Sequence, residues 1–355
     1  MKHNFGAGPC ILPPDVFQQA ADAVLDFNGL SILEISHRSK DYVAVIEEAR
    51  DLVRQALNVP KGYTILYLQG GATLGFTISA LTMMRDKKKA AYIDTGTWST
   101  GAIKEARVLG IDVNVVGSSE DKNYTYIPKD LKPCDDADFF YYTSNNTIRG
   151  TEFHAKPNTN LPLVCDMSSD IMSRVVNVAD YDFIYAGAQK NIGPAGATIY
   201  IVKEDCLGKS TCPIIPKYLD LKKHAEKDSM LNTPPVYSIY VAMLNLRHLM
   251  ANGGVAAIEK KNIEKSTLLY NEIDNNPLFV GNVAVEDRSR MNVTFHLKDD
   301  SLNERFNKMC DDAGFVAYKG HRSVGGYRVS LYNALPLSSV QAMVDVMKEF
   351  TRVNG

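Results

Sequence analysis

The order of apolar and amphipathic segments predicts an α/β protein with two domains. Seven short apolar segments alternate with segments of helical period, and this alternation indicates a mostly parallel, seven-stranded sheet covered by helices. After Pro234-Pro235 the order changes to long helical segments with a few strands, which suits a smaller α+β domain at the C-terminal end. The seven strands are expected at residues 64–68, 90–94, 113–116, 139–143, 161–166, 183–186 and 197–202.

The helical segments divide the chain at a Gly-containing break. Asn252-Gly253-Gly254 separates two long segments, and we place the domain boundary within the second of them. Residues 15–257 are expected to form the large domain, and residues 1–14 with 258–355 the small one. Helices are expected at residues 74–84, 100–109, 238–251, 255–275, 302–313 and 338–353, and two further strands at 291–297 and 327–332.

Composition excludes several classes of function. The 355 residues are 45% hydrophobic and carry a net charge of −2, so no strong field favours nucleic acid or an acidic membrane. No apolar run reaches the roughly 20 residues of a bilayer span, and the N-terminus does not have the pattern of a signal peptide. The six cysteines are scattered without metal-binding spacing. We therefore expect a cytoplasmic protein with reduced cysteines and no metal.

The strongest candidate catalytic residue is Lys190. It follows a short apolar strand and precedes a turn rich in Gly and Pro, which holds the lysine backbone and keeps large side chains away. A partly desolvated lysine in such a place can form a Schiff base with a carbonyl cofactor. Taken alone, a lysine in a loop is more often an ordinary surface charge.

Three further segments follow strand ends. Asp166 could pair with the protonated nitrogen of a pyridine ring, although a single Asp after a strand is more often a helix cap. Leu68-Gln-Gly-Gly-Ala-Thr-Leu-Gly75 offers free N–H groups for a phosphate at a helix N-terminus, without dinucleotide or P-loop spacing. Trp98, the single tryptophan, could stack on a flat ring or fill the core. Their order along the chain fits a fold-type I pyridoxal-phosphate enzyme.

Longer motifs resemble one family over almost the whole chain. Tyr185-Ala-Gly-Ala-Gln-Lys-Asn-Ile-Gly-Pro-Ala-Gly196 is similar to the cofactor-lysine motif of the phosphoserine aminotransferases, which belong to the class V aminotransferase family. The other segments that carry the resemblance are Asn4-Phe-Gly-Ala-Gly-Pro9, Ser36-His-Arg38, Asn232-Thr-Pro-Pro235, Ala251-Asn-Gly-Gly-Val255, Arg288-Ser-Arg-Met-Asn292 and Gly320-His-Arg-Ser-Val-Gly-Gly-Tyr-Arg328.

The resemblance implies a role for each cofactor-binding residue. Lys190 would hold pyridoxal 5′-phosphate covalently and then move the proton, while Asp166 pairs with the ring nitrogen. Trp98 would stack on the ring, and Thr147 would reach its phenolic oxygen. The residues that would hold the phosphate are Ala72, Thr73 and Gln189, with Asn232 and Thr233 contributed by the neighbouring subunit of a homodimer.

The resemblance also implies the substrates, glutamate and 3-phosphohydroxypyruvate, which exchange an amino group by a ping-pong mechanism in serine biosynthesis. Each substrate carries an α-carboxylate and a distal anion, so two groups of cations are needed. Arg328 is the candidate for the α-carboxylate because a guanidinium can bind it through two hydrogen bonds. The candidate distal group is His37, Arg38, His321 and Arg322, the first two from the partner subunit.

The chain departs from the common family pattern at two positions. An arginine or cysteine often stands where this chain has Thr73, so the hydroxyl and backbone N–H groups must supply that contact. Glycine is frequent where Ser39 stands, and we expect no functional consequence. In bacteria the family also acts on 3-hydroxy-2-oxo-4-phosphooxybutanoate, giving 4-phosphohydroxythreonine for vitamin B6 biosynthesis, a substrate that the distal cations would equally suit.

Three other classes of protein share some of these features. A cysteine desulfurase would need a nucleophile in a mobile loop, whereas Cys310 lies in a segment of helical period, and Gln189 stands where desulfurases carry histidine. A non-catalytic relative is expected to lose the lysine, the aspartate or the arginines, which are all present. A nicotinamide dehydrogenase would need the missing GxGxxG.

Overall fold

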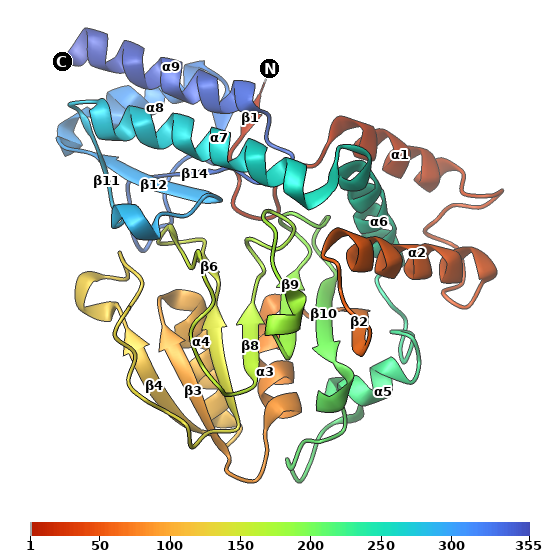
Figure 1. Cartoon of the computed structure of the whole chain (residues 1–355). Helices are drawn as coiled ribbons and strands as arrows, with labels where there is room; N and C mark the ends of the chain where they lie inside the picture. Colours follow the sequence, from red (N-terminus) through yellow and green to blue (C-terminus); the bar gives the residue numbers. More distant parts are fainter. Residues whose placement is uncertain (1) are drawn as a thin grey trace.

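The computed structural model describes residues 2–355, and a seven-stranded sheet forms its centre (Figure 1). The strand order is β2-β10-β9-β8-β5-β3-β4, with β10 antiparallel to both of its neighbours and the other strands parallel to one another. The strands are β2 (Tyr63–Leu68), β3 (Lys89–Asp94), β4 (Asp112–Ser118), β5 (Phe139–Thr143), β8 (Leu163–Asp166), β9 (Phe183–Gly187) and β10 (Thr198–Lys203).

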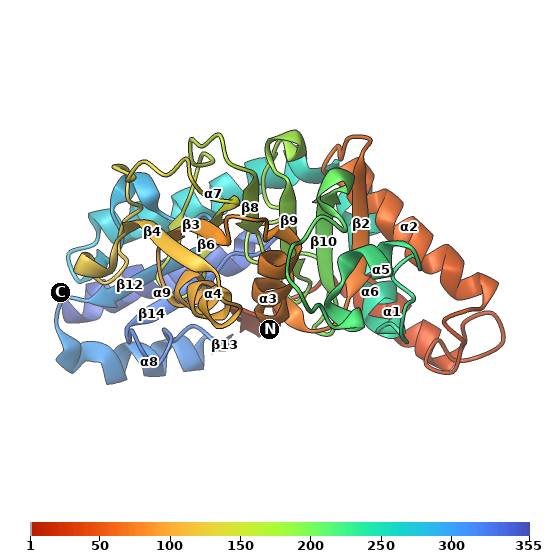
Figure 2. The same cartoon turned by 90° about the horizontal axis from the view of Figure 1, so that it is seen from below.

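Successive side chains of a strand point to opposite faces of this sheet, and helices pack against both faces. In β2, Leu66 and Leu68 pack into the apolar cluster under α3 and α4, whereas Ile65 and Tyr67 pack into the cluster under α1, α2 and α6. Figures 1 and 2 show α3 and α4 lying together against the sheet. The helices of this unit are α1 (Pro14–Leu25), α2 (Lys40–Ala56), α3 (Gly71–Met83), α4 (Thr97–Val108), α5 (Leu221–Ala225) and α6 (Val236–Ala251).

A smaller α+β unit follows. Its three-stranded antiparallel sheet has the order β11-β12-β14, and the N-terminal strand β1 pairs in parallel with β13. Figure 1 shows this unit above the sheet edge at which β8 ends, with both chain termini in it. Its elements are β1 (His3–Asn4), α7 (Gly254–Asn275), β11 (Phe279–Gly281), β12 (Asn292–Leu297), α8 (Asn303–Asp312), β13 (Phe315–Val316), β14 (Tyr327–Ser330) and α9 (Leu337–Asn354).

The buried clusters divide along α7. Leu12 and Val255 belong to the cluster of the large sheet, whereas Phe5 and Leu269 belong to that of the small unit. The division at residues 14/15 and 257/258 stays a prediction, and Met1 lies outside the described residues.

The seven predicted strands and the mostly parallel sheet are confirmed, and the predicted helices are present with ends shifted by a few residues. Cys310 lies buried on α8, as predicted, and all six cysteines are free. Helices α1 and α2 were not predicted, and Ser39 begins α2 by accepting a hydrogen bond from the Tyr42 N–H. Within residues 2–355, none of the helices has the length and apolar character needed to cross a bilayer.

Candidate active site

Six strands of the sheet end at one edge, and the predicted residues follow the ends of five of them. The last residues of β2, β3, β5, β8 and β9 are Leu68, Asp94, Thr143, Asp166 and Gly187. Because these strands are parallel, their carboxyl ends meet at the same edge, which is where open α/β sheets bind ligands. The sequence-predicted phosphate turn, tryptophan, aspartate and lysine are brought to this edge.

A tight loop between β9 and β10 fixes the backbone of Lys190. The Ala188 N–H donates to Ala197 O at 2.9 Å, and the Gly193 N–H donates to Ala188 O at 2.7 Å. A side chain at Gly193 would lie only 2.9 Å from Cα of Ala242, so glycine lets the loop contact α6 closely. The loop therefore holds Lys190 rigidly between the sheet and α6.

The Lys190 side chain is buried and chemically tuned. Its Nζ donates to Thr147 Oγ1 at 2.9 Å. Burial lowers the pKa of Lys190 to about 8; the charge of Asp166 opposes this shift, and the charge of Arg328 adds to it. An amine with this pKa is present in both protonated and neutral forms near neutral pH, as a nucleophile or a proton carrier requires.

Asp166 is a buried carboxylate at the end of β8. Its Oδ1 accepts hydrogen bonds from Ser168, from the N–H at 2.8 Å and from Oγ at 2.6 Å. Burial raises the pKa of Asp166, while the two Ser168 bonds and the charge of Lys190 lower it. A carboxylate fixed in this way can pair with a cationic ring nitrogen.

The turn after β2 presents a helix N-terminus. Gly70 and Gly71 have positive φ angles of 106° and 65°, and α3 begins at Gly71 without a side-chain cap. An α-helix leaves its first N–H groups without intrahelical acceptors, so the amides of Ala72 and Thr73 can bind a phosphate. A side chain at Gly70 would collide with Leu74 at 2.3 Å, which explains why glycine is required there.

Trp98 lies in the first turn of α4, just after β3. Its side chain is 37% exposed and thus available to stack on a ring. The helix beneath it is held by Asp94, whose Oδ1 accepts from Ser99 Oγ at 2.9 Å and from Thr100 Oγ1 at 2.8 Å. The sequence motif thus serves two purposes, since Asp94 fixes the turn that carries the exposed indole.

Thr147 and Arg328 join the two units of the chain. Arg328, on β14, donates from Nη1 to Thr147 O at 3.3 Å, while its Nε is buried without a hydrogen-bond partner. Burial lowers the pKa of Arg328. A buried, unpaired guanidinium nitrogen beside Lys190 is suited to binding an anion.

His321 and Arg322 lie in the loop before β14, and His321 Nδ1 is 2.8 Å from Ser323 Oγ. Burial lowers the pKa of His321, and the charges of Arg328, Arg322 and Arg149 lower it further. Sequence analysis missed Arg149. The signal that could have found it is its position two residues after Thr147 in the turn that follows β5.

Asn232 and Thr233 lie beside the residue that precedes the α3 turn. Gln69 accepts from Asn232 Nδ2 at 3.4 Å and donates to Thr233 O at 2.5 Å. Gln189 is half-buried next to Lys190, and its carbonyl accepts from the Cys10 N–H at 3.1 Å.

His37 and Arg38 lie in the connection between α1 and α2, at the end of the molecule beside β2 (Figure 1). His37 borders a groove of about 370 Å³ that Thr233 also lines, and its Nε2 is buried without a partner. Across the described chain, no hydrogen bond or ion pair joins His37 or Arg38 to Lys190.

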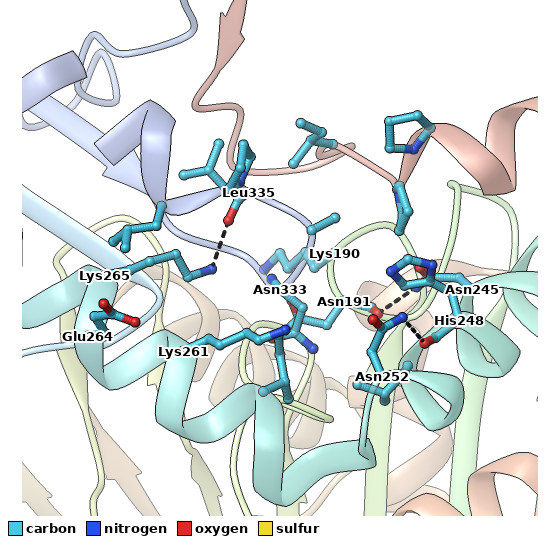
Figure 3. Close-up of a pocket in the computed structure, with 18 residues that line it drawn as sticks. Lys190, Asn191, Asn245, His248, Asn252, Lys261, Glu264, Lys265, Asn333 and Leu335 are labelled. Carbon is cyan, nitrogen blue, oxygen red and sulfur yellow. Dashed lines mark hydrogen bonds between the residues drawn. The ribbon is translucent and has the colours of Figure 1, made fainter. Parts of the chain in front are cut away.

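A cavity beside the Lys190 loop is lined by residues of both units (Figure 3). Its volume is about 480 Å³, and several of its polar groups are already bonded: Asn245 donates to Asn191 O, Lys265 donates to Leu335 O, and His248 contacts Asp15. Burial lowers the pKa of Lys265 to about 7, while its three carbonyl acceptors favour the charged form. This cavity lies where the two units meet, and few of its polar groups are without a hydrogen-bond partner and thus free to bind a substrate.

Comparisons with known proteins show the family and the fold of the chain. The Aminotransferase class-V family model matches residues 3–343. A phosphoserine aminotransferase from Flavobacterium johnsoniae is 56% identical, with 98% of each chain covered. The structure of the Bacillus circulans subsp. alkalophilus phosphoserine aminotransferase superposes with a TM-score of 0.96 at 40% identity, covering 100% of this chain and 99% of that one. The pyridoxal-phosphate-bound enzyme from Trichomonas vaginalis has a TM-score of 0.93 at 36% identity, covering 98% and 100%.

Proposed function

Because the chain belongs to the phosphoserine aminotransferases of the class-V aminotransferase family, we propose that the residues around Lys190 carry out its amino-group transfer between glutamate and 3-phosphohydroxypyruvate. The products are O-phospho-L-serine and 2-oxoglutarate, so the enzyme serves serine biosynthesis. The observation that best supports these roles concerns Lys190. Its buried amine donates a hydrogen bond to Thr147 and interacts with the charges of Asp166 and Arg328.

Pyridoxal phosphate is the cofactor, and the residues present fit it. Lys190 supplies a buried amine with a lowered pKa, Asp166 a carboxylate for the ring nitrogen, and Trp98 an exposed indole for the ring face. The phosphate would be held by the α3 N-terminus through Ala72 and Thr73, with Gln189 beside them. The bound cofactor supplies an electron sink for the carbanion formed at the substrate Cα.

The protein residues then hold substrate and protons in place. Lys190 Nζ acts as a base when it removes the proton from the substrate Cα, and then as an acid when it gives the proton back to complete the transfer. Thr147 Oγ1 accepts a hydrogen bond from that nitrogen and would hold it in position for both proton transfers. Asp166, fixed by two bonds from Ser168, would pair with the ring nitrogen.

Substrate recognition depends on cations at two distances from Lys190. Arg328, whose charge lowers the pKa of Lys190, would bind the α-carboxylate. His321 and Arg322 would contact the distal anion, which is a carboxylate in glutamate and a phosphate in the keto acid. The same contacts suit 3-hydroxy-2-oxo-4-phosphooxybutanoate, which we propose as a second substrate.

We further propose a homodimer in which the partner completes each site. His37 and Arg38 lie far along the chain from Lys190 in a connection at the molecule's edge, beside the groove lined by Thr233. Apolar side chains are exposed in the same region: Leu25 is 83% exposed, Leu30 57% and Leu33 62%. Apolar exposure of this kind marks protein interfaces, so a second subunit would bring His37, Arg38, Asn232 and Thr233 to the neighbouring cofactor and substrate.

A substrate panel tests the proposed function. Purified protein loaded with pyridoxal phosphate is given glutamate with 3-phosphohydroxypyruvate, with its four-carbon phosphorylated analogue, or with unphosphorylated hydroxypyruvate, and 2-oxoglutarate is measured. Turnover with the phosphorylated keto acids is expected, with hydroxypyruvate a much poorer substrate. Release of sulfide from cysteine, in place of transamination, would contradict the proposal.

A further inference from the structure

Four cationic residues lie close enough to influence one another, since the charges of Arg149, Arg322 and Arg328 all act on His321. Three of them were predicted from the sequence, whereas Arg149 comes from the turn after β5. Throughout residues 2–355, none of the four forms an ion pair with an acidic side chain. A group of cations without acidic partners favours binding of an anion with more than one negative charge.

The backbone and the aliphatic part of Arg149 are held in place. Its N–H donates to Asn146 O at 3.2 Å, and its carbonyl accepts from Thr294 Oγ1 at 3.0 Å. Its guanidinium carbon lies 5.5 Å from the centroid of the Tyr124 ring. A Cβ placed on Gly96 would lie 3.6 Å from Arg149 Cγ, so this stem lies directly against the turn that carries Trp98.

One nitrogen of this fixed guanidinium has no acceptor. Nε of Arg149 is buried and makes no hydrogen bond in the described chain. A buried N–H of a charged group without an acceptor is costly, and a ligand oxygen would remove that cost. The observation therefore indicates a ligand that accepts hydrogen bonds at this point.

Arg149 lies near His321, the residue proposed above to contact the distal anion. The charge of Arg328 lowers the pKa of both Lys190 and His321, whereas the charge of Arg149 lowers that of His321. We propose that Arg149 binds the distal phosphate of the keto acid together with His321 and sets the preference for phosphorylated substrates. This inference rests on the proposed function. An added cation attracts a phosphate dianion more strongly than it attracts the singly charged γ-carboxylate of glutamate.

The test compares Arg149→Gln with Arg149→Lys, with Arg107→Gln as a matched control. Arg107 is an exposed arginine in the last turn of α4. For each holoenzyme, KM is measured for 3-phosphohydroxypyruvate and for glutamate, together with the inhibition constant of inorganic phosphate, which probes the distal site because the bound cofactor already fills the phosphate turn.

Arg149→Gln is expected to raise the KM for 3-phosphohydroxypyruvate and the phosphate inhibition constant by about tenfold or more. The KM for glutamate should change less than about fivefold, and Arg149→Lys should recover part of the loss. Equal changes for both substrates, or none, would overturn the inference. If the wild-type enzyme does not transaminate the phosphorylated keto acid at all, the proposed function fails instead.

Discussion

At the scale of single residues, burial is the main physical cause of the site's chemistry. The amine of Lys190 lies in a buried environment that lowers its pKa to about 8, although Asp166 pulls the pKa in the opposite direction. Arg328 adds a like charge that helps burial keep the pKa low. The site thus makes a nucleophile of a group that in water is almost fully protonated at neutral pH.

This lowered pKa predicts how cofactor attachment depends on pH. Only the neutral amine attacks the aldehyde of pyridoxal phosphate, so attachment to the apoprotein should accelerate about tenfold per pH unit below the pKa and level off above about pH 8. The rate can be followed by absorbance in stopped-flow mixing, with Lys190→Ala as the control that shows no attachment. A rate still rising near about pH 10 would indicate an ordinary, exposed lysine.

Sequence alone made Lys190 and Asp166 candidates because each stands at or after the carboxyl end of an apolar strand, where open α/β sheets bind ligands. Arg149 could not be identified in this way. A lone arginine in a loop is usually a solvated charge, and the residues that fix Arg149, Tyr124 and Thr294, are distant in the sequence or on the other unit. Contacts of this kind appear only once the chain is folded.

At the scale of elements, strands were easier to predict than helix ends. Strand β2 alternates between two apolar clusters, so its pattern is strong. Helix α4 begins at Thr97, three residues before the predicted start, because Ser99 and Asp94 cap a turn that hydrophobic periodicity does not register. Helix α2 was not predicted, although its buried residues recur at helical spacing and Ser39 caps it by accepting from the Tyr42 N–H.

The turn before α3 gives an element-scale prediction. Gly70→Ala should weaken pyridoxal-phosphate binding and lower the free energy of unfolding by about 2–4 kcal/mol, because the new Cβ combines a positive φ with a collision against Leu74. Gly110→Ala is the matched control: its φ is 80° with nothing within 4 Å of the added Cβ. It should cost about 1–2 kcal/mol and leave cofactor affinity unchanged.

Both quantities are measurable on the same preparations, by chemical denaturation and by fluorescence titration of the apoprotein. Unchanged cofactor affinity in Gly70→Ala would mean that the α3 N-terminus does not hold the phosphate. Equal losses of affinity in both variants would point to general destabilisation.

At the scale of the whole molecule, the central question is whether two chains share each site. Sequence motifs implied the partner residues only through family resemblance, because a single chain's periodicity carries no information about a second copy. The isolated chain leaves Leu25, Leu30 and Leu33 exposed near the connection that carries His37 and Arg38. A shared interface would bury this apolar surface and complete the site together.

Hybrid dimers test this arrangement. Arg38→Ala and Lys190→Ala should each be nearly inactive, but co-expressed subunits should regain about a quarter of wild-type activity, since half of the dimers would hold one intact site of two. Activity is compared with that of separately purified variants mixed without subunit exchange. Absence of recovery in verified hybrid dimers would show that Arg38 acts within its own chain.

A single-turnover measurement on Lys190→Ala shows directly whether Lys190 moves the proton. Wild-type holoenzyme mixed with glutamate should release one 2-oxoglutarate per site and then convert added 3-phosphohydroxypyruvate to phosphoserine. Lys190→Ala should lose this conversion by a factor on the order of 10² to 10⁴, whereas Lys203→Ala, on the partly exposed end of β10, should retain it. Transfer at the wild-type rate in Lys190→Ala would contradict the assignment of Lys190 as the residue that moves the proton.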